Sequence, residues 1–447
     1  MTKKLWGGRF KKNIDEEFEV FSRSIQYDYK LAEYDILHSL LHVAALLESS
    51  LITQKEAAEL DDALTELLAQ VQDGVFKPDM NSEDIHSDIQ NKLEKKTGKT
   101  ALKLHTLRSR NDQIAFDVKF YCFARANTIS QLLSMLVDSF TQLSLQYEGE
   151  PFVGYTHMQR AQVIKFSDYA GAYAAMIRRD HKRMKNYAGH LDIGIGAGAL
   201  AGSSIPHKAY SQAIREMFEE NTAGIAPVTN ALEHVSDRDF VIEFMSILAI
   251  IQMHISRFAE DMLLYSTSEF NYVDLPEEFC TGSSLMPHKK NVDFLELARG
   301  YTGRIYGGLI SELTMMKGLP LSYNRDMQLD KEPLFYASEY VEDLLSMMIR
   351  FVAGIKLNHE RITQALSDEN LYAVEIAEYL VHEGVAFKDA HDIVGRMVSA
   401  AAEKKIKLSE IPQDELSRYH GSLTNEQLKK IVTPQYAVSQ KRSIKRK

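Results

Sequence analysis

The chain has 447 residues, of which 45% are hydrophobic and 26% charged, a composition that predicts a folded protein of two or three domains. Its formal net charge of −10 excludes binding to nucleic acid or to an anionic membrane surface as the main activity. The two cysteines, Cys122 and Cys280, exclude a disulfide framework, so a reducing cytoplasm is the expected compartment.

Neither a secretory signal nor a membrane span is expected. The basic residues that follow Met1 precede no apolar stretch of the kind that a signal peptide needs. The most apolar window, residues 241–255, is short and is interrupted by Glu243 and Gln252. It predicts a helix buried inside a large bundle.

The spacing of prolines and of apolar residues predicts an all-α protein. Long intervals without proline, such as 79–150 and 334–411, leave room for long helices. Within such intervals apolar residues recur with the helical period, as they do over 132–143 and 247–255. The expected domains are an N-terminal helical domain at 1–111, a central long-helix bundle at 112–360 and a C-terminal helical domain at 361–447.

The first polar cluster, residues 105–113, lies immediately before the first long helix. Ser109, Arg110 and Asn111 carry groups that bind carboxylates, and Asp112 is the expected N-cap of that helix. A helix N-terminus beside Arg and Asn side chains forms an anion site. The alternative is an Arg-rich helix cap packed against a neighbouring domain.

The second polar cluster, residues 154–162, lies on an expected short connection between two long helices. Thr156 and His157 present a hydroxyl and an imidazole there, beside the amides of Gln159 and Gln162. Histidine is the usual side chain for proton transfer near neutral pH. A structural hydrogen-bonding role is the alternative for a single histidine.

The third cluster, residues 282–291, reads Gly-Ser-Ser-Leu-Met-Pro-His-Lys-Lys-Asn. Hydroxyls, ammonium groups and an amide lie here between the flexible Gly282 and the rigid Pro287. This composition suits a loop that closes over a carboxylate and directs hydrogen-bond donors at it. A solvated surface turn is the alternative.

The fourth cluster, residues 319–331, contains Tyr323 followed by Gln328 and Lys331. The last two are three positions apart, so they share one face of a helix. The group suits a polar, amino-acid-like substrate, and an ordinary exposed helix start is the alternative.

Three other features predict no function. Residues 194–202 are rich in glycine, but the Gly-Lys-Ser/Thr ending and the preceding strand of a phosphate loop are missing. The basic residues 441–447 read as a solvated charge run. Histidine and cysteine never occur at zinc-ligand spacing, so no metal is expected.

Together these segments resemble the fumarase/aspartase superfamily of fumarate-releasing lyases and, within it, the argininosuccinate lyases. The segment 282–291 marks the superfamily, whereas 105–113 and 155–162 point to the argininosuccinate branch. The resemblance covers nearly the whole chain and is carried by these segments: 5–10, 83–86, 105–113, 154–162, 236–239, 282–291 and 319–331.

The resemblance implies a three-domain fold whose long helices assemble into a homotetramer with a twenty-helix core. It implies active sites that combine segments of three subunits and a reaction that needs no cofactor. That reaction cleaves a small molecule, argininosuccinate, to arginine and fumarate, the last step of arginine biosynthesis.

By the same resemblance Ser283 is the catalytic base and Lys289 stabilises the developing negative charge. His157, oriented by Glu296, helps to protonate the leaving nitrogen. The implied substrate-binding residues are Asn291, Ser109, Arg110, Asn111 and Thr156, together with Ser24, Tyr323, Gln328 and Lys331 at the arginine end.

The chain departs from the family pattern at His288, Val292 and Leu329, at residues 206–208 and in its C-terminal ending. A sister lyase acting on another N-succinyl compound, such as adenylosuccinate, therefore stays open, slightly favoured by His288. A crystallin-like homologue without activity is a further alternative. The retained catalytic residues named above disfavour it.

Overall fold

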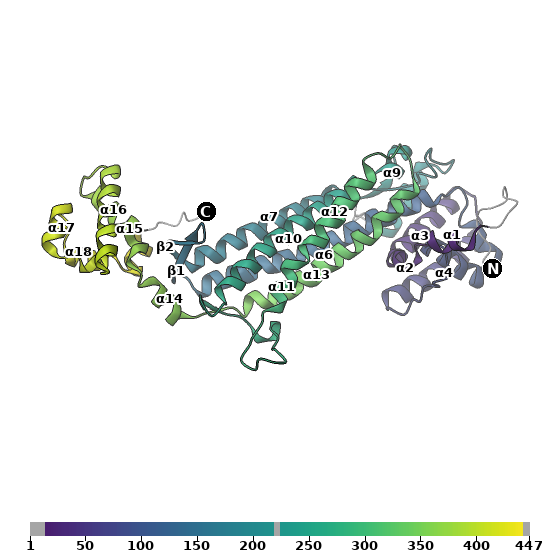
Figure 1. The fold of residues 1–447 in the computed structure, drawn as a ribbon. Coiled ribbons are helices and arrows are strands. Elements are labelled where there is room, and N and C mark those ends of the chain that lie inside the picture. The colour runs from purple at the N-terminus through teal and green to yellow at the C-terminus, as the bar shows by residue number, and fades with distance from the viewer. Residues whose placement is uncertain (1–13, 219–223, 441–447) are drawn as a thin grey trace. The chain divides into compact units, whose positions relative to one another are not determined.

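The computed structural model describes residues 14–218 and 224–440, which form nineteen α-helices, six 3₁₀ helices and three two-stranded sheets (Figure 1). Two segments named above, residues 5–10 and the basic tail 441–447, lie outside the described residues. The predicted all-α class is confirmed, with three small sheets that the sequence did not predict.

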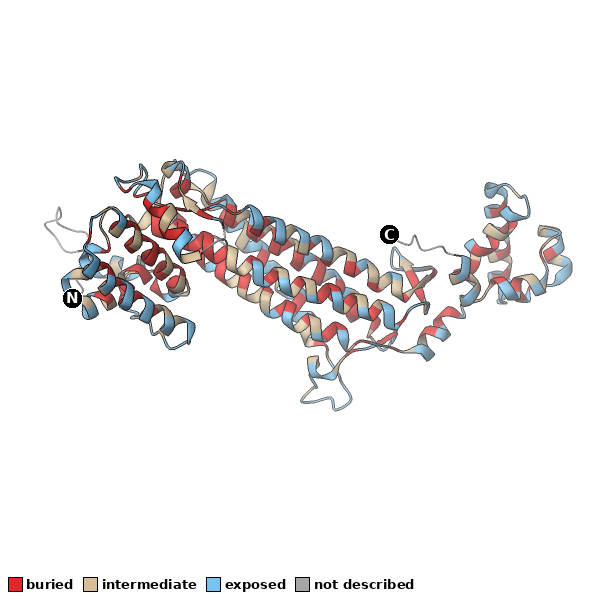
Figure 2. Ribbon diagram, turned by 180° about the vertical axis from the view of Figure 1, so that it is seen from behind, coloured by how far each residue is buried: buried red, intermediate tan, exposed pale blue. Residues whose placement is uncertain are grey.

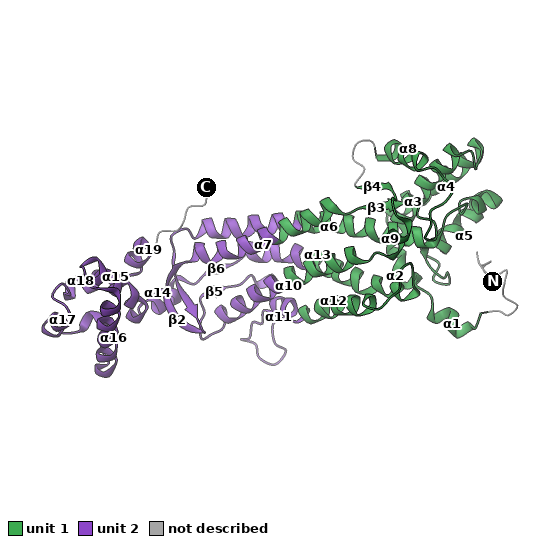
Figure 3. Cartoon of the chain, turned by 90° about the horizontal axis from the view of Figure 1, so that it is seen from above, with its two compact units in different colours: residues 1–131, 180–252, 301–343 green, residues 132–179, 253–300, 344–447 purple. Residues whose placement is uncertain are grey.

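The contacts divide the chain into two compact units, each built from three separate segments (Figure 3). Unit 1 comprises residues 1–131, 180–252 and 301–343, and unit 2 comprises residues 132–179, 253–300 and 344–447. The three expected domains are instead consecutive stretches of the sequence, and this division of the chain stays a prediction.

Four long helices contribute residues to both units. They are α6 (Arg110–Gln146), α7 (Phe166–His190), α10 (Asp239–Tyr265) and α13 (Lys331–Ala353). Helix α6 alone has 37 residues, as its proline-free apolar pattern predicts. Pro333 lies in the first turn of α13, where the missing N–H group costs no helical hydrogen bond.

Unit 1 also contains helices from the N-terminal part of the chain and one parallel pair of strands. Within it, Tyr121 of α6 contacts Phe335 of α13 edge-on, with ring centroids 4.7 Å apart. Its remaining elements are α1 (Glu16–Phe21), α2 (Ile25–Asp28), α3 (Ala32–Glu48), α4 (Gln54–Gln72), α5 (Ile85–Thr97), β3 (Ile193–Ile195), α8 (His207–Phe218), β4 (Ile225–Pro227), α9 (Ala231–Ser236) and α12 (Thr302–Met316).

Unit 2 combines bundle segments with two antiparallel strand pairs, β1–β2 and β5–β6, and with the C-terminal helices. Phe140 of α6 packs against Tyr173 of α7 and Phe258 of α10, at centroid distances of 5.9 and 5.0 Å. Its remaining elements are β1 (Pro151–Thr156), β2 (Gln159–Lys165), β5 (Val273–Asp274), α11 (Asp293–Gly300), β6 (Lys356–Leu357), α14 (His359–Leu366), α15 (Ala373–His382), α16 (Phe387–Lys404), α17 (Gln413–Tyr419), α18 (Asn425–Ile431) and α19 (Pro434–Gln440).

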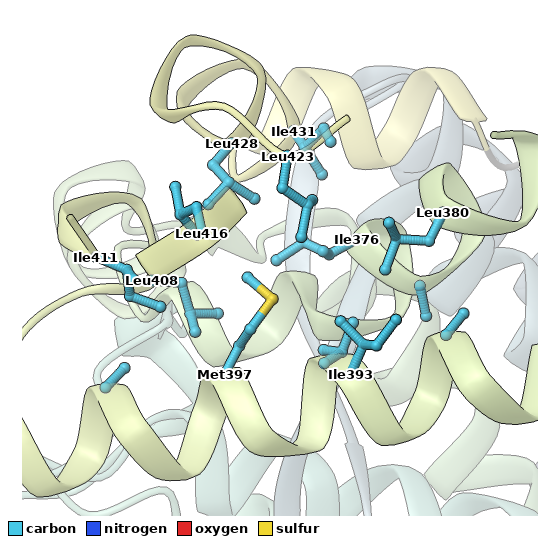
Figure 4. Close-up of a cluster of buried hydrophobic side chains, with 14 residues drawn as sticks. Ile376, Leu380, Ile393, Met397, Leu408, Ile411, Leu416, Leu423, Leu428 and Ile431 are labelled. Atoms are coloured by element: carbon cyan, nitrogen blue, oxygen red, sulfur yellow. The ribbon is translucent and has the colours of Figure 1, made fainter. Parts of the chain in front are cut away.

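Helices α15 to α18 enclose a hydrophobic cluster of their own (Figure 4). Leu380, Met397, Leu416 and Leu428 are completely buried in it. Each fully buried side chain of this size contributes about 1.5–3 kcal/mol. Burial at helical spacing therefore explains why the C-terminal segments form short amphipathic helices.

Helix α10 is the one described helix that is long and apolar enough to cross a bilayer. Its most apolar 18-residue window is 61% buried within the fold, and Leu248, Ile251 and Phe258 are buried. Figure 2 shows buried residues along the whole length of the long helices. Packing inside the bundle accounts for the apolar sequence of α10.

Candidate active site

The Ser- and Lys-rich segment of unit 2 forms a loop closed at its base. Thr281 and Asn291 exchange two backbone hydrogen bonds of 2.9 and 2.8 Å. Between them the chain leaves the helices just before α11 (Figure 1). Leu285 at its tip is 84% exposed, so this loop presents its side chains outward.

The Ser283 hydroxyl has a defined environment within this loop. Its Oγ accepts hydrogen bonds from the backbone N–H groups of Leu285, at 3.3 Å, and Met286, at 3.0 Å. Two donors directed at one oxygen stabilise negative charge there more than they stabilise the neutral hydroxyl. The local geometry therefore fixes the position of the Ser283 oxygen.

The other catalytic candidates of this region are exposed. Lys289 lies in the loop and Glu296 in the first turn of α11, both with exposed side chains. Asn291 is half-buried where the loop closes, and Val292 behind it is buried. The buried Val292 anchors the loop to α11, whereas His288 is exposed.

The segment expected as a simple connection between helices is an antiparallel hairpin of β1 and β2. His157 and Met158 form its two-residue turn, with φ angles of +52° and +62°. Two consecutive positive φ angles are typical of a type I′ hairpin turn, which usually contains Asn or Gly. Other side chains are strained at a positive φ angle, and strained backbone of this kind is common at functional sites.

The hairpin presents its tip to solvent. Thr156 and His157 are exposed, and Met158 is 70% exposed. The base of the hairpin is held by Phe152, which is buried against the rings of Phe166 and Tyr272. A packed base thus supports an exposed imidazole.

Within the described part of the chain, no hydrogen bond or ion pair joins His157 to Glu296 or to Ser283. The expected pairing of His157 with Glu296 therefore does not form inside one chain. Their proposed catalytic roles stay predictions.

Unit 1 brings two predicted substrate-binding residues, Ser24 and Arg110, onto one short segment, residues 83–87. The backbone N–H of Ser24 donates to the Glu83 carbonyl at 2.9 Å. Arg110 donates to the Ser87 hydroxyl at 2.7 Å and pairs with Asp84 at 2.8 Å. Residues far apart in sequence are thereby fixed on the start of α5.

Gln328 and Lys331, which also belong to unit 1, are held by other neighbours. The Gln328 amide donates to the Ser22 carbonyl at 3.2 Å. Lys331, which is 3% exposed, pairs with Asp330 at 2.8 Å, and Asp330 also accepts from Arg238 at 2.6 Å. Both cations thus share one buried carboxylate.

Two further groups of this region are largely removed from water. Burial raises the pKa of Tyr323, which keeps its hydroxyl protonated and able to donate. Burial, reinforced by the nearby Asp330, raises the pKa of Glu312 on α12 to about 8. Sequence reasoning missed Glu312, because it lies inside an apolar stretch of a helix.

The expectation that Asp112 caps the first long helix is wrong. Helix α6 begins at Arg110, so Asp112 lies inside its first turn, where its carboxylate accepts from the backbone N–H of Gly196 at 3.1 Å. The Asn111 amide donates to the Ala199 carbonyl at 3.0 Å. The glycine-rich segment 194–202 thus packs on the start of α6.

A buried polar triad of Asp35, His86 and Asp117 was also missed. His86 donates to Asp35 at 2.8 Å and lies 3.7 Å from Asp117. These ligand atoms lie within 4.8 Å of one another, close enough to hold a metal ion. The Asp35 oxygen, however, already accepts from both His86 and Gln113. The histidine was visible in the segment 83–86, but its partners come from α3 and α6.

One cavity within the described part of the chain lies away from the predicted residues. A cavity of about 550 Å³ in unit 1 is lined by Lys119, Tyr187, His234 and Asp237, among others, and by none of the predicted catalytic or substrate-binding residues. In unit 1 the predicted residues are held by neighbouring groups, and in unit 2 they are mostly exposed.

Comparison with known proteins shows which family the chain resembles. A family model described as lyase matches residues 8–307, and one described as argininosuccinate lyase C-terminal matches residues 370–439. An argininosuccinate lyase of Syntrophus aciditrophicus is 40% identical over 93% of this chain and 87% of that protein. One of Geobacter metallireducens is 43% identical over 89% of this chain and 85% of that protein.

The chain belongs to the argininosuccinate lyase family. The predicted family and lyase class are thereby confirmed. The fold is confirmed independently by a class II fumarase from Schistosoma mansoni, which is 16% identical, covers 94% of each chain and has a TM-score of 0.77. The argininosuccinate lyase C-terminal match falls on α15 to α19, the helices that include the separate hydrophobic cluster.

Proposed function

We propose that the chain cleaves argininosuccinate to arginine and fumarate by general acid/base catalysis, as the last step of arginine biosynthesis in the cytoplasm. The relatives named argininosuccinate lyase support the substrate. The two free cysteines, Cys122 and Cys280, are compatible with a reducing compartment.

The reaction requires a proton to leave the succinyl carbon next to a carboxylate. The C–H electron pair then forms the double bond of fumarate, the C–N bond breaks, and the leaving nitrogen takes up a proton. Because the first step adds negative charge to an anionic group, the site must direct cations and donors at that group. Lys289, Asn291, Ser109, Asn111 and Thr156 are the residues that we assign to this task.

The two N–H groups donating to the Ser283 oxygen carry the proposal. A serine hydroxyl is a poor base unless its surroundings stabilise the alkoxide. The backbone donors of Leu285 and Met286 supply such stabilisation in part. Lys289, brought closer when the loop closes over substrate, supplies the remainder. Ser283 then takes the proton, and His157 with Glu296 serves the leaving nitrogen.

The hydrogen-bonded group of unit 1 suits the arginine end of the substrate. Ser24, Tyr323, Gln328 and Lys331 offer hydroxyl, amide and ammonium groups, which match an amino-acid backbone and its polar side chain. Since their positions are fixed by neighbouring residues, little side-chain entropy is lost when the substrate binds.

We further propose a homotetramer whose sites combine segments from different copies. Tyr306, Ile310 and Leu313 lie at helical spacing on α12 and are 40%, 61% and 44% exposed. An exposed apolar stripe on a long helix fits a surface covered by a second copy. In such an assembly, the exposed His157 of one copy can contact the exposed Glu296 of another.

The assembly is tested by Ile310→Asp, with Val75→Asp as a matched control that is 60% exposed on a loop. Light scattering after gel filtration should show a tetramer for the parent chain and the control. The Ile310 variant should dissociate and lose turnover, since its sites would no longer be complete. An active monomeric variant would overturn the shared site.

The substrate is tested by incubating the purified full chain with argininosuccinate and with adenylosuccinate, following fumarate by its ultraviolet absorbance. We expect fumarate release from argininosuccinate. The Ser283→Ala variant, purified in the same way, serves as the control for contaminating activity. The opposite substrate preference would overturn the proposal.

A further inference from the structure

The glycine-rich segment 194–202, hereafter the glycine loop, has a shape that only glycine permits. Gly196 and Gly198 have φ angles of +94° and +57°. A Cβ atom on Gly198 would lie 2.6 Å from the carbonyl oxygen of Gly202, which is backbone and cannot give way easily. A backbone hydrogen bond of 2.8 Å from Gly202 to Ala197 closes the turn.

The protein's own carboxylate occupies this loop. Asp112, which is 1% exposed, accepts from the Gly196 N–H, and the backbone N–H groups of Ala197 and Gly198 lower its pKa. Burial outweighs them and raises the pKa of Asp112 to about 6. Successive backbone N–H groups around an anion form a nest of the kind that binds phosphates elsewhere.

The same loop fixes the side chain of Asn111. One N–H of the Asn111 amide donates to the Ala199 carbonyl, so the nitrogen end of the amide is fixed toward the loop. The amide nitrogen has a second N–H, which is then available for an anion. The backbone N–H of Asn111 also donates to the Ser109 hydroxyl at 3.3 Å, which links the two predicted carboxylate ligands.

We propose that the glycine loop is a positioning element of the substrate site, which anchors Asp112 and thereby directs the Asn111 amide at a substrate carboxylate. The inference rests on the substrate-binding role proposed above for Asn111. The glycine loop would thus have a function although it is not a phosphate loop and Asp112 is not a helix cap.

The variant Gly198→Ala tests the proposal, with Gly74→Ala as the matched control. Gly74 also has a positive φ, +68°, but a Cβ atom there meets nothing within 4 Å, so this control measures backbone strain alone. We expect Gly198→Ala to raise KM for argininosuccinate about tenfold, the scale of one hydrogen bond to a charged group. Gly74→Ala should leave KM unchanged.

A double-mutant cycle separates positioning from general destabilisation. In an Asn111→Ala background, Gly198→Ala should change KM less than twofold, because its effect acts through the missing amide. An equal change in both backgrounds would overturn the proposal. Should Gly198→Ala fail to fold, Asp112→Asn takes its place with an expected rise of about threefold, since a neutral acceptor binds the Gly196 N–H more weakly.

Succinate binding, measured by calorimetry, makes the test independent of turnover. Gly198→Ala should weaken succinate binding about tenfold, and again only where Asn111 is present. If the parent chain binds succinate but releases no fumarate from argininosuccinate, the proposed reaction fails and the positioning role stands. Unchanged succinate affinity in Gly198→Ala would reject the positioning role alone.

Discussion

The residues of unit 1 that we assign to substrate binding and the residues of unit 2 that we assign to proton transfer differ in how firmly the chain holds them. Ser24 and Lys331 are 5% and 3% exposed and hydrogen-bonded to neighbouring side chains. His157, Lys289 and Glu296 are exposed, on a hairpin tip, a loop and a first helical turn. The groups assigned to binding are thus held by neighbours within the chain, whereas those assigned to proton transfer are exposed. In the proposed assembly the exposed groups gain contacts when the loop closes or from another copy.

The largest effect should follow from Ser283→Ala. Removing the proposed base should lower turnover by about 10²-fold or more, the scale for losing general acid/base catalysis. Its stability should change little, because the Ser283 side chain is only part-buried and its partners lie within its own loop. Steady-state fumarate release and thermal unfolding check both statements, and near-normal turnover would remove Ser283 from the mechanism.

Next in size is His157→Asn, which should also lower turnover by about 10²-fold or more. Asparagine tolerates the positive φ of this position better than most residues, so the hairpin turn should be kept. Met158→Asn is the matched control, because it alters the same strained turn and leaves the imidazole in place. Equal losses in the two variants would mean that the turn, and not the imidazole, is what matters.

The hairpin also shows where sequence reasoning stops. The helical period of apolar residues predicted α6 and α10, because burial of one face imposes that period locally. It did not predict β1 and β2, because no Asn-Gly or Asp-Gly marks their turn. His157 adopts a positive φ there that its sequence neighbours do not indicate.

The candidate site divides in the same way. Motifs pointed to Arg110 and Gln328, since each lies in a dense polar segment. Their anchoring partners, Ser87 and the Ser22 carbonyl, could not be read from those motifs. Such contacts join positions that are distant along the chain, so only the fold brings them together.

Fixing polar groups in unit 1 has a cost that should appear as a pH dependence. Burial, reinforced by the nearby Asp84, raises the pKa of Asp28 from 3.8 to about 6, while Asp28 accepts from the Ser24 hydroxyl at 2.6 Å. A raised folded-state pKa means that protonated Asp28 stabilises the fold below pH 3.8, and that this stability is lost as the pH rises through about 6.

Asp28→Asn should therefore gain stability relative to the parent chain between about pH 4 and pH 7, by at most about 3 kcal/mol at 1.36 kcal/mol per pKa unit. Denaturant unfolding at several pH values measures this difference. Free energies of unfolding that run parallel in the two proteins would show that Asp28 carries no such penalty.

The smallest effect should fall on binding alone, and it tests the comparison most directly. Arg110→Lys keeps the positive charge but loses the planar fork that contacts both Ser87 and Asp84. Because Arg110 belongs to the ordered half of the site, its loss should raise KM about tenfold, the scale of one charged hydrogen bond, and leave turnover within about twofold. A fall in turnover with KM unchanged would instead mean that Arg110 acts in the transition state, as Ser109 and Asn111 of the same unit are proposed to do. The assignment of Arg110 to binding alone would then be wrong, since an interaction made only in the transition state lowers turnover and kcat/KM together.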